Sequence, residues 1–198
     1  MIDDGRADGE TGGADALAEA DTLILVDEAD REVGYLSKAR CHDGRGVLHR
    51  AFSLLIFNTA GELLLQQRAA SKRLWPLYWS NSCCSHPRRF ESLETASQRR
   101  LYEELGVRCP LQFLFKFQYQ AQWDANAAEN ELCSVYIGRT RGPIQADPAE
   151  IAGLRWVSPG QLQLEMAQRR PGQFTPWFMM EWERLWNDHR PAVLGTRS

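Results

Sequence analysis

Residues 75–87 read WPLYWSNSCCSHP, and the segment ESLETASQRRLYEELGV follows at residues 91–107. In the second segment Ser92 is of a residue type that caps helix N-termini, and Gly106 is of the type that most often ends helices. Between them, leucines and an alanine recur at the spacing of one helix face. These signals predict a helix over residues 93–105.

The first segment places a thiol close to an imidazole. Cys84 and His86 stand two positions apart, so on an extended strand their side chains point to the same side, where a neighbouring charge can activate the thiol. Cys83 then points to the other side, and we interpret it as a small buried apolar residue. Simple burial of both cysteines is the competing interpretation from these residues alone.

Strand-like segments surround this region. Residues 51–57 and 62–67 flank the turn-forming Asn58-Thr59-Ala60-Gly61 and predict a hairpin, and residues 22–26 and 32–36 predict a shorter one. Further strands are predicted at 113–120, 131–139 and 155–157, with a polar loop at 123–130 and helix starts at Ser158-Pro159 and Thr175-Pro176. Residues 37–50 are polar and predict a loop or broken helix that carries side chains into a site. This mixture of hairpins and helices favours an α+β sandwich.

The composition describes one globular unit. With 198 residues, 25% charged and 10% aromatic residues and a net charge of −3, the chain is expected to be an ordinary soluble protein with one core. The weak negative charge argues against general nucleic-acid binding, and no apolar run reaches the roughly 20 residues that span a bilayer. Residues 1–21 lack the features of a secretory signal and are expected to be a flexible extension. Five cysteines, an odd number, indicate reduced thiols and a cytoplasmic location.

Imidazoles and carboxylates indicate a metal site. If Glu129 and Glu131 begin a strand, their spacing of two places both carboxylates on one face. With His42, His49 and His86 they would form a mixed nitrogen and oxygen site for Mn²⁺, Mg²⁺ or Zn²⁺. Spacing alone does not require the five side chains to converge, and a single histidine is more often an ordinary surface or hydrogen-bonded residue.

Basic residues point to a phosphate-bearing ligand. Lys38, Arg68 and Lys72 have the charge to bind its phosphates, and Glu104 has a carboxylate that can hold Mg²⁺ against them. Solvated surface side chains are the competing interpretation for such residues. Trp177 belongs by default to core packing, although one tryptophan face can also stabilise a cation in a closed pocket.

Six segments match one known family in that family's own order. They are LHRAF at 48–52, QRAASK at 67–72, WPLYWSNSCCSHP at 75–87, YEELGV at 102–107, ENELC at 129–133 and TPW at 175–177. Together they resemble the type I isopentenyl-diphosphate delta-isomerases, a branch of the Nudix superfamily, over roughly residues 22–188. Any one segment would be only suggestive, whereas the combination is specific.

The resemblance implies a fold, a reaction and a cellular setting. The implied fold is α+β, a Nudix-like mixed sheet sandwich flanked by helices, with an N-terminal hairpin and C-terminal helix additions, in one domain at residues 22–190 followed by a tail at 191–198. The implied reaction interconverts isopentenyl diphosphate and dimethylallyl diphosphate in isoprenoid biosynthesis, by protonating the double bond and removing a proton from the adjacent carbon. The implied partner is a small isoprenoid diphosphate, with no nucleic acid and no membrane, and the enzyme would be a cytoplasmic monomer or weak dimer.

The resemblance also implies residue roles. Cys84 and Glu131 match the catalytic thiol and carboxylate on opposite faces of the substrate, and Tyr119 matches a tyrosine that assists proton transfer beside the carboxylate. The positions that match the ligands of a tightly held Mn²⁺, Zn²⁺ or Mg²⁺ are His42, His49, His86, Glu129 and Glu131. Glu104 matches the ligand of the Mg²⁺ bound with the diphosphate. The substrate-binding matches are Lys38, Arg68 and Lys72 for the diphosphate and Trp177 for the isoprenoid tail.

Two positions depart from the Nudix hydrolase motif. Ser85 replaces its first glycine, which is also usual in the isomerase branch, so a serine is tolerable there only if φ is negative. Arg100 replaces a metal-binding glutamate, which weakens the alternative of a Nudix pyrophosphohydrolase. A second alternative is a non-catalytic module that binds metal or diphosphate, and the retained Cys84, Glu131 and metal-ligand set argue against it.

Overall fold

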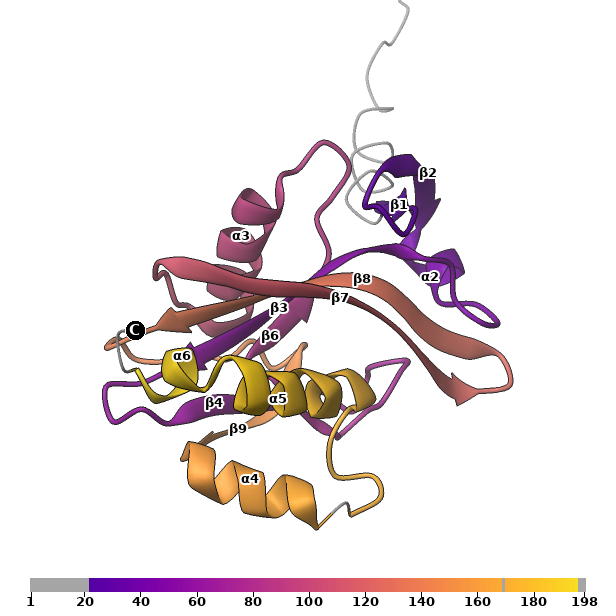
Figure 1. Ribbon diagram of the computed structural model, residues 1–198. Helices are drawn as coiled ribbons and strands as arrows, with labels where there is room; N and C mark the ends of the chain where they lie inside the picture. Colours follow the sequence, from indigo (N-terminus) through magenta and orange to yellow (C-terminus); the bar gives the residue numbers. More distant parts are fainter. Residues whose placement is uncertain (1–21, 169, 196–198) are drawn as a thin grey trace, which may run out of the picture.

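The computed structural model describes residues 22–168 and 170–195, so the predicted extension at residues 1–21 lies outside the described residues. The strands are β1 (Thr22–Val26), β2 (Glu32–Ser37), β3 (His49–Phe57), β4 (Leu63–Arg68), β5 (Trp79–Ser80), β6 (Cys83–Ser85), β7 (Leu111–Asp124), β8 (Ala127–Arg139) and β9 (Ile151–Val157). The helices are α2 (Lys38–Cys41), α3 (Leu93–Leu105), α4 (Pro159–Ala167), α5 (Pro176–Asp188) and α6 (Arg190–Leu194), placed around the strands as Figure 1 shows. Within the described ranges, no helix is long and apolar enough to cross a membrane.

Strand β3 is the centre of the sheet. Its sequence HRAFSLLIF is almost continuously apolar, as expected of a strand covered on both faces. Strand β8 runs parallel to it along its whole length, from the pair His49 and Glu131 to the pair Phe57 and Arg139. The other edge of β3 pairs in succession with β1, β6 and β4. The first half of β3 therefore has strand neighbours that come from distant parts of the sequence.

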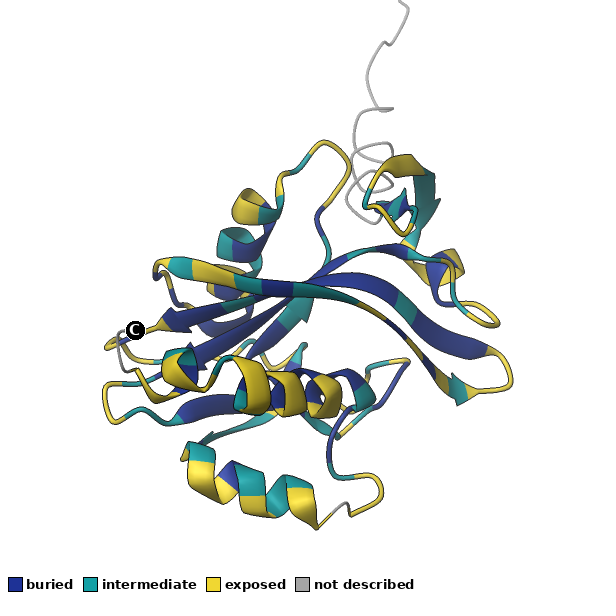
Figure 2. Cartoon of the chain, in the orientation of Figure 1, coloured by how far each residue is buried: buried dark blue, intermediate teal, exposed yellow. Residues whose placement is uncertain are grey.

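Alternation along β3 divides the core into two layers. Leu55 and Phe57 belong to the cluster that contains Trp182 of α5, whereas Leu54 and Ile56 belong to the cluster that contains Leu101 of α3. Figure 2 shows the continuous run of buried residues along β3 and the strands beside it. The sheet is thus enclosed between α3 and α5, and the predicted α+β sandwich flanked by helices is confirmed.

The helix predicted at residues 93–105 is also confirmed. The hydroxyl of Ser92 accepts a hydrogen bond from the backbone N–H of Thr95 at 3.1 Å, and this bond satisfies one of the free donors of the first turn. Gly106 ends the helix with φ 67°, a left-handed conformation that glycine adopts without steric cost. The predicted hairpin of β1 and β2 is present as well.

The prediction of a polar loop at residues 123–130 is wrong. Strands β7 and β8 continue through this segment and are joined by a turn at residues 125–126. Polarity misled the prediction because Glu129 is buried in the strand, where other polar side chains of the protein face it, and is not solvated in a loop.

The hairpin predicted at residues 51–57 and 62–67 has its turn, but its strands separate at once. Strands β3 and β4 pair only at Phe57 and Leu63. Ser82 lies between them, because its hydroxyl accepts from the Ile56 N–H at 2.8 Å and donates to the Leu64 carbonyl at 2.7 Å. This separation makes room for β6 beside β3.

The predicted tail at residues 191–198 begins inside a helix. Helix α6 spans Arg190–Leu194, and its Val193 is fully buried in the same cluster as α5. The first residues of the tail therefore pack onto the domain.

Packing around Gly138 of β8 predicts a sensitive position. A Cβ atom added there would lie 2.8 Å from Cys109 Sγ and 3.0 Å from a methyl group of Ile56. We expect Gly138→Ala to lower the free energy of unfolding by about 1–3 kcal/mol, because the core must shift to admit the methyl group. Urea unfolding would measure the change. Gly160→Ala, where a Cβ atom meets nothing within 4 Å, is the matched control, and equal stability of the two variants would contradict the prediction.

Candidate active site and metal centre

A pocket of 340 Å³ gathers side chains from α2, β4, β6, α3, β7, β8, α5 and the loops between these elements. Its lining includes the predicted catalytic and substrate-binding residues Lys38, Arg68, Lys72, Cys84, Tyr119 and Trp177. Four of the predicted metal ligands, His42, His86, Glu129 and Glu131, also line it. The residues assigned from the sequence therefore come together in one place, except that His49 and Glu104 lie outside the lining.

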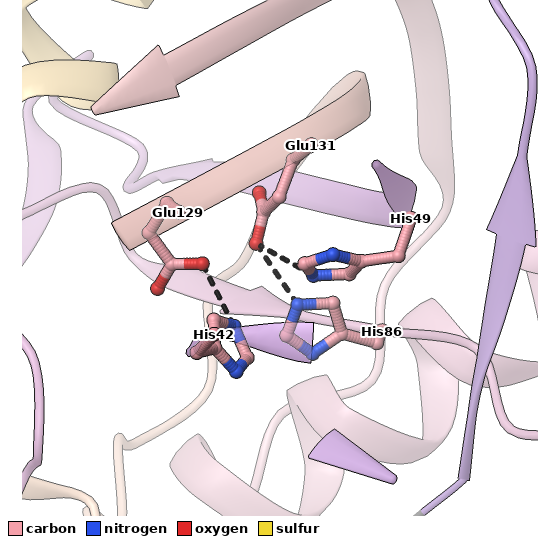
Figure 3. Close-up of side chains that lie close together, drawn as sticks. All are labelled: His42, His49, His86, Glu129 and Glu131. Carbon is pink, nitrogen blue, oxygen red and sulfur yellow. Dashed lines mark hydrogen bonds and ion pairs between the residues drawn. The ribbon is translucent and has the colours of Figure 1, made fainter. Parts of the chain in front are cut away.

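The five predicted metal ligands converge. Glu129 and Glu131 lie on one face of β8, and His49 on β3 pairs with Glu131 across the parallel ladder. His42 directly follows α2, and His86 directly follows β6. One ligand atom of each residue lies within 4.8 Å of those of the others, and Figure 3 shows the side chains grouped around a common centre.

Backbone carbonyls orient two of the imidazoles. His42 Nδ1 lies 2.6 Å from the carbonyl oxygen of Lys38, and His49 Nδ1 lies 2.7 Å from that of Val47. A carbonyl oxygen only accepts, so each Nδ1 carries a proton and each Nε2 faces the cluster. Metal-binding histidines adopt this arrangement, because the second hydrogen bond fixes the ring and its tautomer.

Two buried atoms of the cluster have no hydrogen-bond partner. His49 Nε2 is 3.7 Å from Glu131 Oε1, too far for a hydrogen bond. Glu129 Oε2 is 2.8 Å from His42 Nε2, but with the imidazole proton on Nδ1 this nitrogen has no proton to donate. A buried polar atom without a partner costs about 1–3 kcal/mol. A divalent ion would satisfy both atoms, and imidazole nitrogens with carboxylate oxygens are suitable ligands, so the donor set fits a metal.

Glu131 is held as a carboxylate. Burial acts to raise its pKa, but the imidazoles of His49 and His86 lower that pKa well below its ordinary value. His86 Nε2 lies 2.9 Å from Oε1, and the Tyr119 hydroxyl donates to Oε2 at 2.7 Å. Burial raises the pKa of Tyr119 well above its ordinary value, so this hydroxyl remains a donor at neutral pH.

The two adjacent cysteines face opposite layers. Cys83 is fully buried in the α3 cluster, whereas Cys84 lines the pocket. Burial raises the pKa of the Cys84 thiol well above its ordinary value, so the thiol is protonated at neutral pH. It donates to Asn81 Oδ1 at 2.7 Å, and Ser53 Oγ lies 3.2 Å from its sulfur. Ser85 has a negative φ, the condition expected for a serine at this position.

Two of the basic residues in the pocket already have partners within the protein. Arg68 donates to the backbone carbonyls of residues 74–75, and its guanidinium lies 5.2 Å from the ring centroid of Trp177. Lys72 forms an ion pair with Glu150, and burial lowers the pKa of Lys72 to about 8. An anionic ligand in the pocket would compete with Glu150 for Lys72.

Glu104 is buried and is covered by an arginine. Arg100 lines the pocket and donates to Glu104 Oε1 at 2.5 Å and to Glu150 Oε1 at 3.0 Å. The carboxylate predicted to hold Mg²⁺ is therefore paired with the arginine that stands in place of a metal-binding glutamate of the hydrolase motif.

The sequence predictions did not include Ser53, Asn81, Glu150 or Glu181. Asn81 lies three positions before Cys84 within residues 75–87, and this proximity was the available signal that it could contact the thiol. Ser53 is a hydroxyl in an apolar strand, and such a group needs a buried partner. Glu150 and Glu181 have no local signal, because the groups they meet, such as Lys72 and Cys133, lie far away in the sequence.

Known proteins resemble the chain over most of its length. A Nudix domain family profile matches residues 47–178. An isopentenyl-diphosphate Delta-isomerase of Nocardia farcinica is 48% identical over 154 residues, which cover 77% of this chain and 87% of that protein. One from Burkholderia multivorans is 44% identical over 162 residues, which cover 82% of this chain and 91% of that protein. Among solved structures, DR0079 from Deinococcus radiodurans shares the fold, with a TM-score of 0.68 at 22% identity over 84% of this chain and 99% of that one.

Removing one imidazole from the cluster should weaken metal binding. We expect His49→Gln to bind Mn²⁺ at least about tenfold more weakly than the wild type, because it loses a ligand whose ring is already oriented. Isothermal titration calorimetry on chelator-treated protein would measure the affinity. His189→Gln is the matched control, because this remaining histidine stacks on Phe115 outside the cluster. Equal affinity of His49→Gln and His189→Gln would contradict the assignment.

A buried carboxyl predicts a pH dependence of stability. Glu181 of α5 is fully buried, and burial raises its pKa from an ordinary 4.5 to about 8. Between these two pH values the unfolded chain has lost this proton and the folded chain has kept it, so the free energy of unfolding falls as pH rises. The fall ends near pH 8 and, at about 1.4 kcal/mol per pKa unit, amounts to several kcal/mol.

Glu181→Gln should remove this pH dependence. We expect the stability advantage of the variant over the wild type to be small near pH 5 and to grow steadily up to about pH 8. Urea unfolding across this range would measure it. Glu183→Gln changes an exposed residue of the same helix and should follow the wild type at every pH. A constant difference between Glu181→Gln and the wild type would show that Glu181 does not titrate in this way.

Proposed function

Because the chain belongs to the Nudix family and, within it, to the isopentenyl-diphosphate Delta-isomerases, we propose that Cys84 and Glu131 carry the two proton transfers of its reaction. The enzyme interconverts isopentenyl diphosphate and dimethylallyl diphosphate. Protonation of the double bond creates a tertiary carbocation, and loss of a proton from the adjacent carbon moves the double bond. One side chain must therefore give a proton and another must take one.

The contrast between Cys84 and Glu131 is the observation that carries this proposal. Both line the same pocket. Cys84 lies on β6 and Glu131 on β8, and these two strands pair with opposite edges of β3. The pKa of the thiol is raised and that of the carboxyl is lowered, so at neutral pH one group is protonated and the other ionised. Two groups in opposite protonation states suit a reaction that adds one proton and removes another.

We also propose that the cluster of His42, His49, His86, Glu129 and Glu131 holds Mn²⁺, Zn²⁺ or Mg²⁺. When bound, such an ion supplies a Lewis acid next to the catalytic carboxylate. Tyr119 lies directly opposite Glu131 in the β7–β8 ladder and donates to Oε2, while His86 contacts Oε1. Because each oxygen has its own partner, Tyr119 is assigned the role of holding the carboxylate in place during proton transfer.

The diphosphate is assigned to the basic side of the pocket, where Lys38, Arg68 and Lys72 contribute positive charge. The Mg²⁺ that accompanies it is assigned to Glu104. Arg100 covers that carboxylate, so Mg²⁺ binding requires the guanidinium to release it. A diphosphate offers the guanidinium another anion of suitable geometry, which supports a coupled exchange of partners.

Aromatic rings give the pocket the surroundings that a carbocation needs. Trp177 is 2% exposed, and its ring lies 6.1 Å from that of Tyr119 and 5.2 Å from that of Trp75. The face of an indole ring attracts a cation, so Trp177 is assigned to the isoprenoid tail. The enclosing rings also exclude water, which would otherwise capture the cation as an alcohol.

A Nudix pyrophosphohydrolase is the competing activity for this fold. The hydrolase motif has a metal-binding glutamate at the position of Arg100. In this chain Arg100 instead forms an ion pair with Glu104. The position therefore supplies no carboxylate for a hydrolytic metal site, and its positive charge opposes metal binding there. This contact supports the isomerase assignment.

Removing either proposed proton-transfer group should abolish turnover. We expect Cys84→Ala and Glu131→Gln each to lower kcat by at least about 10²-fold with isopentenyl diphosphate and Mg²⁺, because one transfer loses its acid or base. Formation of the acid-labile allylic product would measure the rate, and circular dichroism and metal content would show that the fold and the metal site persist.

Cys83→Ala is the matched control, because this neighbouring thiol packs against α3 and not in the pocket. It should retain the wild-type kcat. Substantial turnover in Cys84→Ala or Glu131→Gln would refute the assigned roles. Release of inorganic phosphate without an allylic product would support the hydrolase, and neither product from metal-loaded protein would support a non-catalytic binding module.

A further inference from the structure

We infer that Ser53 and Glu181 are positioning residues for the Cys84 thiol, and that Cys133 links them in a buried hydrogen-bonded chain behind it. The inference rests on the proposed role of Cys84. Ser53 on β3 is the direct cross-strand partner of Cys84 on β6. Ser53 and Glu181 are 1% and 0% exposed, and neither lines the pocket, so they reach the substrate only through Cys84.

Asn81 sets the donor-to-acceptor direction of these hydrogen bonds. Its amide nitrogen donates to the backbone carbonyls of Cys83 at 2.9 Å and Leu54 at 3.3 Å, so its oxygen is the atom that faces Cys84. That oxygen accepts the thiol proton of Cys84 at 2.7 Å. With its single proton directed at Asn81, the sulfur is an acceptor toward Ser53, whose hydroxyl lies 3.2 Å away and is therefore the donor.

Glu181 closes the other end of the chain. Cys133 Sγ lies 3.4 Å from Ser53 Oγ and 3.9 Å from Glu181 Oε1, so the three side chains form one group. Glu181 Oε2 is buried without a hydrogen-bond partner. The titratable groups that influence Glu181 include Glu131 and Cys133 of β8, and the structure records no ion pair with a cation for Glu181 within the described ranges.

An uncharged acid is the form of Glu181 that these surroundings favour. A carboxylate in such a site would be a buried charge without compensation, which is far more costly than a neutral carboxyl group. Since the single thiol proton of Cys133 is directed at Ser53, the neutral acid has a proton to donate to the Cys133 sulfur, 3.9 Å away. The donors then point one way, from Glu181 to Cys133, from Cys133 to Ser53, from Ser53 to the sulfur of Cys84, and from the Cys84 thiol to Asn81.

The hydrogen-bonded chain acts on proton transfer by Cys84. A hydrogen bond from Ser53 restricts the rotation of the Cys84 side chain and stabilises negative charge that develops on sulfur when the thiol gives up its proton. Because Ser53 and Glu181 do not touch the substrate, their loss should affect the proton-transfer step and leave substrate binding unchanged.

Two substitutions of Glu181 separate donation from simple packing. Glutamine keeps a donor in nearly the same volume, whereas methionine fills the space without one. We expect Glu181→Gln to keep kcat within about threefold of the wild type and Glu181→Met to lower it by about tenfold, with KM for isopentenyl diphosphate unchanged in both. Ser53→Ala should resemble Glu181→Met, and the double variant should be no slower than Ser53→Ala alone, because both changes break one chain.

Ser134→Ala and Glu183→Met are the matched controls and should have the wild-type kcat. Ser134 is a buried serine on β8 whose hydroxyl has no hydrogen-bond partner, and Glu183 is exposed on α5. Thermal unfolding would show that each variant is folded, and if Glu181→Met does not fold, Ser53→Ala decides by the same criterion.

Wild-type kcat in Glu181→Met or Ser53→Ala would overturn the inference. So would a loss in Glu181→Gln as large as that in Glu181→Met, because donation alone would then be insufficient. These outcomes differ from a failure of the proposed function, which would appear as an inactive wild type or a fully active Cys84→Ala.

Discussion

Burying two carboxylates in a sheet costs several kcal/mol per ion unless neighbouring groups compensate the charge. Glu129 and Glu131 meet this condition only because β8 pairs in parallel with β3 in one register, which brings His49 opposite Glu131. His42 and His86 arrive from other segments to complete the group. A slip of one residue between β3 and β8 would turn both carboxylates to the α3 side and leave them without partners. The His/Glu cluster and the centre of the fold therefore depend on the same register.

Alternation along the strands lets one short segment serve both packing and chemistry. Cys83 fills space beneath α3, and its neighbour Cys84 faces the pocket. The segment can lie beside β3 only because β4 diverges after one residue pair, with Ser82 bonded to both strands at the point of separation. The fold thus places a thiol near the His/Glu cluster without interrupting either core layer.

Two cations that line the pocket, Lys72 and Arg100, are paired with carboxylates of the protein. Glu150 pairs with both Lys72 and Arg100, and Arg100 pairs in turn with Glu104. Such a network keeps basic side chains gathered at a buried position, where an unpaired charge would be costly. The difference between an isomerase and a hydrolase on this fold then depends on individual side chains, since the Nudix sheet and helices are shared.

Sequence alone determined the features that depend on nearby residues. The helix at residues 93–105 has its N-cap and its terminating glycine next to it in the sequence. Residues 75–87, together with the five other matching segments, are specific enough to identify the family. Tertiary structure decided what depends on distant residues: the buried strand where a loop was predicted at 123–130, the convergence of the five predicted metal ligands, and the surroundings of Glu181. The physical reason is that hydrogen-bond caps and helical spacing act over a few residues, whereas burial, pKa and strand pairing depend on groups that only the folded chain brings together.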